Sequence, residues 1–377
     1  MSAHAFLSAS GSHRWLQCTP SAALERHLPD QGSVYAKEGS KAHACAEAAL
    51  NAFLTKSSPV EIASDPEMAR NVETYVDFVI EKFNGVRKTT TADAVLLIEQ
   101  RLDFSPWVPE GFGTGDAVIL ADKTLEVIDL KYGKGVPVSA KNNSQMKLYA
   151  LGALHIYGLF YDIDQVTMTI VQPRLNDISS DTITIAELLH WGEEIKPIAQ
   201  KAFNGQGEYR PGDHCQFCRA AAICKPRAEY NLELMKYEFE EADLLSDEDI
   251  SFILSREKQL TNWLKTVTKY ALEEAVLQDR KWPGYKLVEG RSNRVITKPD
   301  GLAKVLEQEN YKPDQIYTAP ALRKLTELEK LVGKAKFAEL SAPYIEKPPG
   351  KLTLVPESDT RDEWTSTKAI IKQFEED

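Results

Sequence analysis

The apolar residues in the first part of the chain recur with two different periods. Over residues 66–84 they return every three or four positions, which predicts an amphipathic helix. Residues 39–54 are rich in alanine, a strong helix former, and predict another helix. Residues 95–102 are mostly apolar and residues 165–172 alternate with period two, so both segments are predicted strands.

The middle of the chain predicts a hairpin followed by a helix. Residues 117–120 are apolar, and Leu125, Val127 and Ile128 continue the pattern after a turn at 121–124. Residues 145–161 then carry apolar side chains on one helical face. The order helix, strand, hairpin, helix, strand predicts an α/β fold with a mixed central sheet flanked by helices.

The pattern changes after residue 228. Ser246 and Asp249 have the spacing of a capping box, which predicts the start of a long helix over residues 250–278. We therefore predict two domains, 1–228 and 229–377, the second being an α+β accessory domain. The further elements predicted in it are two short strands over residues 281–297 and helices over 300–309 and 319–333.

Composition and charge limit the class of protein. The chain has 377 residues, 43% of them hydrophobic and 27% charged, as in ordinary globular proteins. No apolar run approaches the ~18 residues of a membrane span, and the N-terminus has no signal-peptide pattern. These features predict a cytoplasmic protein without a membrane partner. The net charge of −11 argues against a protein that coats nucleic acid by electrostatics alone.

Two carboxylates and a lysine are the candidate chemistry of the hairpin. Asp116 precedes its first apolar run, and Asp129 follows its second, so the hairpin brings both to one end of the sheet. Carboxylates are hard oxygen ligands for Mg²⁺ or Mn²⁺. Lys131 shares a face with Asp129 because the side-chain period of a strand is two. Leu130 then points into the core, which leaves its backbone carbonyl free to reach a metal.

These residues resemble the PD-(D/E)xK nuclease superfamily, in its RecB-like branch. The resemblance is carried by Asp116, by Asp129-x-Lys131 and by Gln145-x-x-x-Tyr149, in that order and spacing. It implies a restriction-endonuclease-like sheet and a catalytic site that includes all five residues, with the helix of Gln145 and Tyr149 beside it. The whole chain also resembles a phage and prophage family of such nucleases.

The resemblance extends to a histidine upstream. Gly39-x-x-x-His43 at the start of a helix is similar to the segment that supplies a metal-ligating histidine in RecB-like nucleases. Glu47 and Glu99 are candidates for residues that lie next to the metal ligands without binding the metal. The alternatives are a solvated surface glutamate for Glu47 and an edge-strand ion pair for Glu99. The implied ligands of Mg²⁺ or Mn²⁺ are His43, Asp116, Asp129 and the carbonyl of Leu130.

A second metal centre is predicted by cysteine spacing. Cys215-x-x-Cys218-x5-Cys224 is typical of a metal site, which needs a fourth ligand. Cys18 is the best candidate, and Cys45 and His214 are the others. One distant and three clustered cysteines resemble the arrangement of iron–sulphur nucleases, which implies a [4Fe-4S] cluster; Zn²⁺ is the alternative. The implied cluster ligands are Cys18, Cys215, Cys218 and Cys224.

The resulting hypothesis is a metal-dependent DNA nuclease, an exonuclease of phage recombination or replication in a bacterial host. Its expected partners are DNA and a phage single-strand-binding or annealing protein, and the sequence gives no oligomeric state. One alternative is a catalytically silent nucleic-acid-binding or scaffold protein with a structural zinc or iron–sulphur site. Another is a zinc-ribbon interaction protein in which the Asp-x-Lys pattern is accidental.

Overall fold

A computed structural model of the whole chain describes residues 5–28, 34–58, 63, 65–89, 94–233, 245–285 and 333. The chain divides into two compact units, Met1–Arg280 and Lys281–Asp377. All helices and strands given below belong to the first unit. The short elements predicted over residues 300–309 and 319–333, and most of those over 281–297, lie outside the described residues.

One mixed sheet of five strands forms the centre of the first unit, as predicted. Its strand order is β1-β2-β3-β4-β5. The pairs β1–β2, β2–β3 and β4–β5 are antiparallel, whereas β3 and β4 are parallel because helix α5 crosses over between them. The strands are β1 (Val95–Asp103), β2 (Phe112–Ala121), β3 (Lys123–Leu130), β4 (Ile163–Gln172) and β5 (Asp177–Thr184).

The predicted hairpin is β2–β3. Its ladder runs from Ala121 paired with Thr124 to Ala117 paired with Ile128. The turn is tight, and Lys123 has a left-handed φ of 66°. Asp116 and Asp129 are each one residue beyond the last of these pairs, so the hairpin register brings the two carboxylates to the same end of the sheet, as expected.

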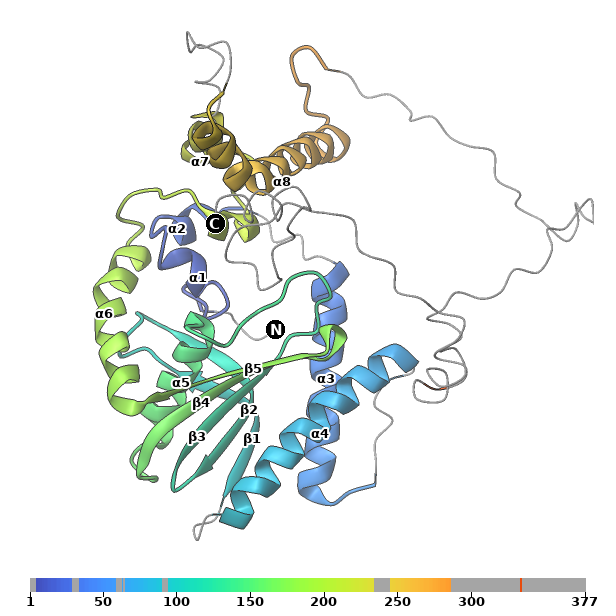
Figure 1. Cartoon of the computed structure of the whole chain (residues 1–377), viewed down its shortest axis with the longest axis vertical. Helices are drawn as coiled ribbons and strands as arrows, with labels where there is room; N and C mark the ends of the chain where they lie inside the picture. Colours follow the sequence, from blue (N-terminus) through green and yellow to red (C-terminus); the bar gives the residue numbers. More distant parts are fainter. Residues whose placement is uncertain are drawn as a thin grey trace, which may run out of the picture. The chain divides into compact units, whose positions relative to one another are not determined.

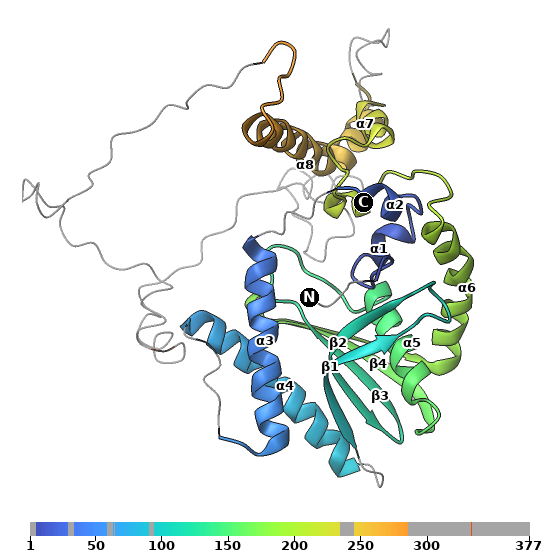
Figure 2. The same ribbon diagram turned by 180° about the vertical axis from the view of Figure 1, so that it is seen from behind.

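Helices cover both faces of the sheet (Figures 1 and 2). Helices α3 (Val34–Thr55) and α4 (Pro66–Thr89) pack on one face through a core that includes Leu50, Val72 and Ile128. Helices α5 (Ser144–Tyr157) and α6 (Ile185–Phe203) pack on the other face. Buried apolar side chains on both faces exclude water from the middle of the sheet.

A strand and a long helix of this unit, β5 and α6, were not predicted. Strand β5 is polar at most positions, and it forms a sheet edge with an alternating, largely exposed pattern. Helix α6 follows it directly and begins with a capping box between Thr184 and Glu187, a sequence signal that would have located its start. Helix α5 ends at Tyr157, four residues earlier than predicted, where Gly158 is the C-cap.

Shorter helices flank the cysteines. Cys18 lies in the chain between helices α1 (Ser12–Trp15) and α2 (Ser21–Glu25). Cys215 lies in η2 (Asp213–Phe217), and Cys218 and Cys224 lie between η2 and α7 (Lys225–Leu232). The predicted long helix is α8 (Asp247–Leu277), and its capping box between Ser246 and Asp249 is present. It falls in the first compact unit. Among the described residues, no helix is both long and apolar enough to cross a membrane.

Candidate metal centre and cysteine centre

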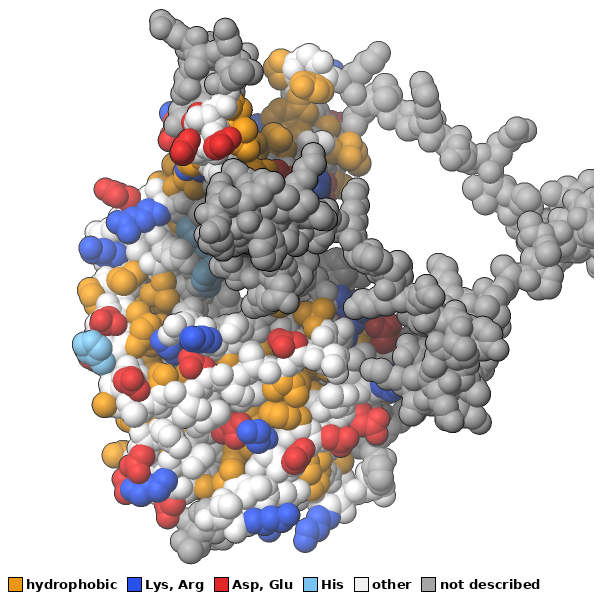
Figure 3. Space-filling model, in the orientation of Figure 1, with side chains coloured by type: hydrophobic (Ala, Val, Ile, Leu, Met, Phe, Trp, Pro, Cys, Tyr) orange, Lys and Arg blue, Asp and Glu red, His pale blue; other side chains and the backbone are white. Residues whose placement is uncertain are grey.

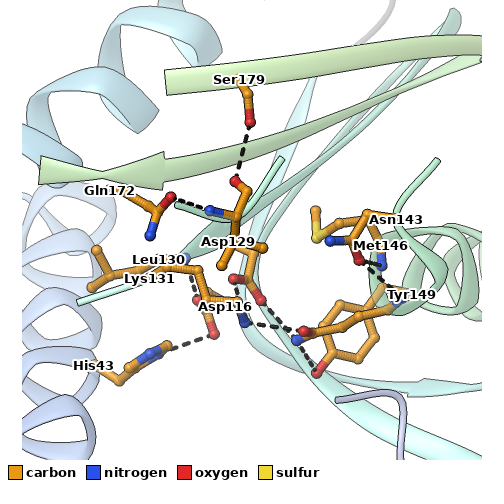
Figure 4. A network of polar contacts seen from close by, with 12 residues as sticks. His43, Asp116, Asp129, Leu130, Lys131, Asn143, Met146, Tyr149, Gln172 and Ser179 are labelled. Atoms are coloured by element: carbon orange, nitrogen blue, oxygen red, sulfur yellow. Dashed lines mark hydrogen bonds and ion pairs between the residues drawn. The ribbon is translucent and has the colours of Figure 1, made fainter. Parts of the chain in front are cut away.

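Four neighbouring elements each contribute one side chain to a polar group on the sheet, and three of these side chains, those of His43, Asp116 and Asp129, are labelled in Figure 4. His43 comes from α3, Glu99 from β1, Asp116 from β2 and Asp129 from β3. We call these four residues the carboxylate–histidine centre. It sits where α3 passes the sheet, so one helix face and three adjacent strands fix its geometry.

Three of these side chains place their ligand atoms close together. Nδ1 of His43 lies 3.1 Å from Oδ1 of Asp116 and 4.0 Å from Oε1 of Glu99. One atom from each of the three residues lies within 4.8 Å of the other two. Their side chains keep 11–32% of their exposure, so the group is accessible from solvent.

The backbone next to Leu130 holds Asp116 from the other side. The amide of Leu130 donates a hydrogen bond of 2.7 Å to Oδ2 of Asp116. The side chain of Leu130 is buried in the core beneath α3 and α4, as predicted. Lys131 emerges beside Asp129, with 2.8 Å between Nζ and Oδ2, which confirms that the two side chains share a face.

Gln145 connects the strand residues to helix α5. Its Nε2 donates to Oδ1 of Asp129 at 3.1 Å, and its Oε1 accepts from Nζ of Lys131 at 3.0 Å. The Nε2 group also lies 3.2 Å from the hydroxyl of Tyr149. Asn143 caps the helix by accepting from the backbone amides of residues 145 and 146, which fixes the start of α5 and hence Gln145.

A glycine allows Tyr149 to approach the strand. A Cβ atom at Gly113 would lie 2.7 Å from the ring of Tyr149, closer than real Cβ contacts. Tyr149 is buried, and burial followed by the charge of Asp129 raises the pKa of its hydroxyl. It therefore remains a neutral hydroxyl, able to hold the amide of Gln145.

The centre has a negative potential that alters its pKa values. Burial by itself lowers the pKa of His43, but the hydrogen bond and charge of Asp116 outweigh it and raise the pKa to about 9. Burial and then Asp116 raise the pKa of Glu99 to about 7. Burial also raises the pKa of Asp129, against the lowering effect of Lys131.

These residues fit a divalent cation. Carboxylate oxygens are the ligands that Mg²⁺ and Mn²⁺ prefer, and a histidine nitrogen is a ligand of transition metals. Oδ2 of Asp129 is buried and, among the described residues, accepts no aligned hydrogen bond; Lys131 lies close but outside hydrogen-bond alignment. Carboxylates held this near one another repel unless a cation lies between them. Glu47 is exposed and lines an open cavity together with His43 and Glu99.

Residues outside the predicted set position the surrounding loop and helix. Gln172 holds the backbone of residues 136 and 138 through hydrogen bonds of 3.1 and 2.7 Å. Ser179 accepts from the amide of Ala140 at 2.9 Å. Arg174 binds Glu38 of α3 at 3.0 Å, and its guanidinium lies 4.7 Å from the ring centre of Tyr132. No motif marks these residues, because their role depends on tertiary contacts.

The four predicted cluster cysteines line one cavity, which we call the cysteine centre (Cys18, Cys215, Cys218 and Cys224). His214 also lines it, but its Nε2 lies 2.7 Å from the carbonyl of Arg210. Cys45 lies on α3 and packs against the core that α3 and α4 form with the sheet. Burial raises the pKa of Cys215, and that of Cys218 to about 12.

Hydrogen bonds join the two chain segments that form the cysteine centre. Glu25 pairs with Arg14 and accepts from the amide of Arg219 at 2.6 Å. Arg227 donates to the carbonyl of Cys215 at 2.6 Å. Arg14 and Arg227 line the cavity, and nearby cations favour thiolates, the form of cysteine that binds metals. The donor set therefore fits a metal or a cluster.

Comparison with known proteins identifies the family. Residues 4–362 match the model of the family described as "Protein of unknown function (DUF2800)", and the chain belongs to this family. A solved structure described as "Crystal structure of SSO0001" has 14% sequence identity and a TM-score of 0.22, over 57% of this chain and 97% of that chain. This likeness is too low to bear on fold or function.

Proposed function

We propose that this member of the DUF2800 family is a metal-dependent deoxyribonuclease, with the carboxylate–histidine centre and Lys131 as its active site. One observation carries the proposal. His43, Glu99 and Asp116 place three ligand atoms within 4.8 Å of one another, and Asp129 with its paired Lys131 stands beside them. Acidic and histidine ligands next to a positioned lysine are suited to phosphodiester hydrolysis.

The cation would be held by His43, Asp116, Asp129 and the carbonyl oxygen of Leu130. When bound, Mg²⁺ or Mn²⁺ would supply Lewis-acid stabilisation of the negative charge on the phosphate. The amide of Leu130 keeps Asp116 oriented through its 2.7 Å hydrogen bond, so a carboxylate oxygen faces His43. The anchoring of Leu130 in the core makes this orientation rigid.

Lys131 would act on the reacting phosphate or on the attacking water. Asp129 and Gln145 hold its ammonium at 2.8 and 3.0 Å, and its side chain retains 27% of its exposure. A positive charge fixed in this way stabilises negative charge that develops during attack. Tyr149 and Gln145 position the lysine and the carboxylate, and in this proposal they do not react themselves.

The substrate that we propose is DNA, cut from an end in phage recombination or replication in the cytoplasm of a bacterial host. A single-strand-binding or annealing protein remains the expected partner. Acidic, basic and apolar side chains are interspersed over the face in Figure 3, and the whole chain has a net charge of −11. Binding would therefore depend on local contacts near the active site. The cysteine centre would hold a [4Fe-4S] cluster as a structural element, with Zn²⁺ as the alternative.

The test is digestion of end-labelled linear DNA and closed-circular DNA with Mn²⁺ by anaerobically purified protein. We expect the wild type to degrade the linear substrate and Lys131→Ala to be slower by about 100-fold or more. Lys123→Ala is the matched control. Lys123 begins the same strand but pairs with Asp162 at its other end, and its loss should leave the rate unchanged.

Each result has a defined meaning. Degradation of the linear substrate alone supports an exonuclease, and cutting of the circle supports an endonuclease with the same site. Equal rates for Lys131→Ala and the wild type would overturn the site assignment. Absence of cutting by folded, metal-supplemented wild type would overturn the nuclease proposal and favour a protein that binds nucleic acid without cleaving it.

A further inference from the structure

An exposed arginine lies next to the carboxylate–histidine centre on the same two strands. The ladder between β1 and β2 pairs Arg101 with Thr114. Arg101 is two residues beyond Glu99 in β1, and Thr114 is two residues before Asp116 in β2. Two residues of a strand span about 6.6 Å, so this pair lies beside the acids of the centre.

The pair faces solvent because its neighbours in the ladder face the core. Leu102, which pairs with Gly113, is buried, and Gly113 lies against the ring of Tyr149 from α5. Side chains alternate along a strand, so Arg101 and Thr114 point away from α5, and both are exposed. Strand β1 is also an edge of the sheet, which places Arg101 at its accessible border.

An aromatic ring fixes the position of the arginine. The guanidinium carbon of Arg101 lies 3.6 Å from the ring centre of Phe112, close enough for a cation–π contact. Phe112 is itself half-buried and belongs to β2, so the ring is held by the sheet. A guanidinium ordered in this way loses less conformational freedom when it binds an anion.

The charge of Arg101 is not taken up by a neighbouring acid. Arg14 and Arg174 each pair with a glutamate, whereas Arg101 forms no ion pair with any of the described residues. Asp103, the acid that follows it in β1, accepts from the backbone amide of Ser105 at 2.9 Å. The guanidinium of Arg101 is therefore available to an anion that a ligand brings.

We propose that Arg101 binds the backbone phosphate of DNA next to the phosphate that is cleaved, and that Phe112 holds its guanidinium in place. The planar fork of an arginine matches two oxygens of one phosphate, and the exposed hydroxyl of Thr114 can donate to the same group. A cation at the border of the negatively charged centre also favours the approach of a polyanion. This inference rests on the proposed function and names how its active site would hold the substrate.

The salt dependence of DNA binding tests this contact. Each phosphate that a protein neutralises adds about one to the slope of log affinity against log salt concentration. Binding of a labelled DNA oligonucleotide is measured by fluorescence anisotropy, with Ca²⁺ in place of Mn²⁺ and with the DNA checked afterwards for cleavage. We expect Arg101→Ala to bind about tenfold more weakly and to reduce the slope by about one. Arg101→Lys should keep the slope, because it keeps the charge, but should bind more weakly because an ammonium has no planar fork.

Arg87→Ala is the matched control. Arg87 is also an exposed arginine over a phenylalanine, with its guanidinium 5.6 Å from the ring centre of Phe83. It lies in the last turn of α4, shortly before β1 begins, whereas Arg101 lies near the end of that strand. Its loss should change neither the affinity nor the slope. A merely structural role for Arg101 predicts a lower Tm of Arg101→Ala with an unchanged slope.

The outcomes distinguish this inference from the proposed function. A lower slope in Arg101→Ala, with the wild-type slope in Arg101→Lys and Arg87→Ala, supports the phosphate contact. If the wild type cuts DNA and Arg101→Ala binds it with the same affinity and slope, the contact is overturned and the nuclease proposal stands. If the wild type binds DNA through Arg101 but does not cut it, the nuclease proposal is overturned and the phosphate contact stands. If the wild type neither binds nor cuts DNA, both are overturned.

Discussion

At the scale of single residues, β3 carries two buried acids with different surroundings. Asp129 faces the carboxylate–histidine centre, whereas Glu126 lies between strands beneath α4. Oε1 of Glu126 is 3.5 Å from Nζ of Lys82 and 3.4 Å from the hydroxyl of Thr169. Burial raises the pKa of Glu126, and the charge of Lys82 offsets this only in part.

The raised pKa makes Glu126→Gln a test of stability against pH. The folded state binds the proton of Glu126 more tightly than the unfolded state, so this contribution is complete below the unfolded pKa of 4.5 and is lost as pH rises through the folded pKa. At pH 7 the substitution removes a buried charge while Lys82 stays 41% exposed to water. We expect the free energy of unfolding to rise by about 1 kcal/mol at pH 7, with no gain at pH 4.

Denaturant titration at both pH values measures this difference. Glu81→Gln, which changes an exposed glutamate next to Lys82 on the same helix, should change stability little at either pH. A lower stability of Glu126→Gln at pH 7 would show that its ion pair outweighs the cost of its burial.

The sequence predicts some residues of the centre better than others. The meeting of Asp116, Asp129 and Lys131 was predictable, because a hairpin register and the period of two place them together. The left-handed backbone of Glu99 leaves no trace in a run of apolar residues. Its place beside Asp116 follows from the ladder between β1 and β2, which is a tertiary property.

At the scale of elements, the cysteine centre joins α1 and α2 to η2 and α7. These segments are about 200 residues apart in sequence, and hydrogen bonds already hold them together: Glu25 accepts from the amide of Arg219, Arg219 donates to the carbonyl of Leu28, and Arg14 donates to the carbonyl of Phe217. A metal or cluster shared by both segments would add to this closure, because binding to the folded state alone stabilises that state.

The variant Cys218→Ser tests whether a metal or cluster joins the two chain segments. We expect the variant to lose the brown colour of an iron–sulphur cluster and to unfold at a Tm lower by about 5 °C or more. Cys45→Ser is the control, since Cys45 is a half-buried cysteine of α3. A variant with the wild-type spectrum and Tm would contradict the cluster, and a colourless wild type containing zinc would establish the zinc alternative.

Elements differ in how well their patterns predict them. The apolar face of α4 and the apolar residues of β3 can be recognised in the sequence, because each element buries a continuous surface in the core. Strand β5 lacks this signal, since it forms a sheet edge and most of its side chains are exposed or half-exposed. An edge strand is stabilised by its ladder with β4, and a ladder cannot be recognised from one strand alone.

At the scale of the molecule, the α/β class with a mixed sheet followed from the order of elements, and the sheet confirms it. The predicted domain boundary at residue 228 stays a prediction, while the compact units divide at residue 280 and place α8 with the sheet. Sequence periodicity locates helices, but it does not tell which unit an amphipathic helix packs against.

The proposed function joins the sheet to α3. We propose that a cation held by α3 and by strands β1, β2 and β3 supports the cleavage of DNA. His43 is the only described member of the centre that comes from a helix, so it tests whether α3 belongs to the active site.

The most direct measurement is the rate of linear DNA cleavage as a function of Mn²⁺ concentration, for wild type and His43→Ala. We expect His43→Ala to need at least about tenfold more Mn²⁺ for half its maximal rate, because it has lost one ligand of that cation. Identical Mn²⁺ dependence and rate in the two proteins would contradict the proposed metal site and place the catalytic cation elsewhere.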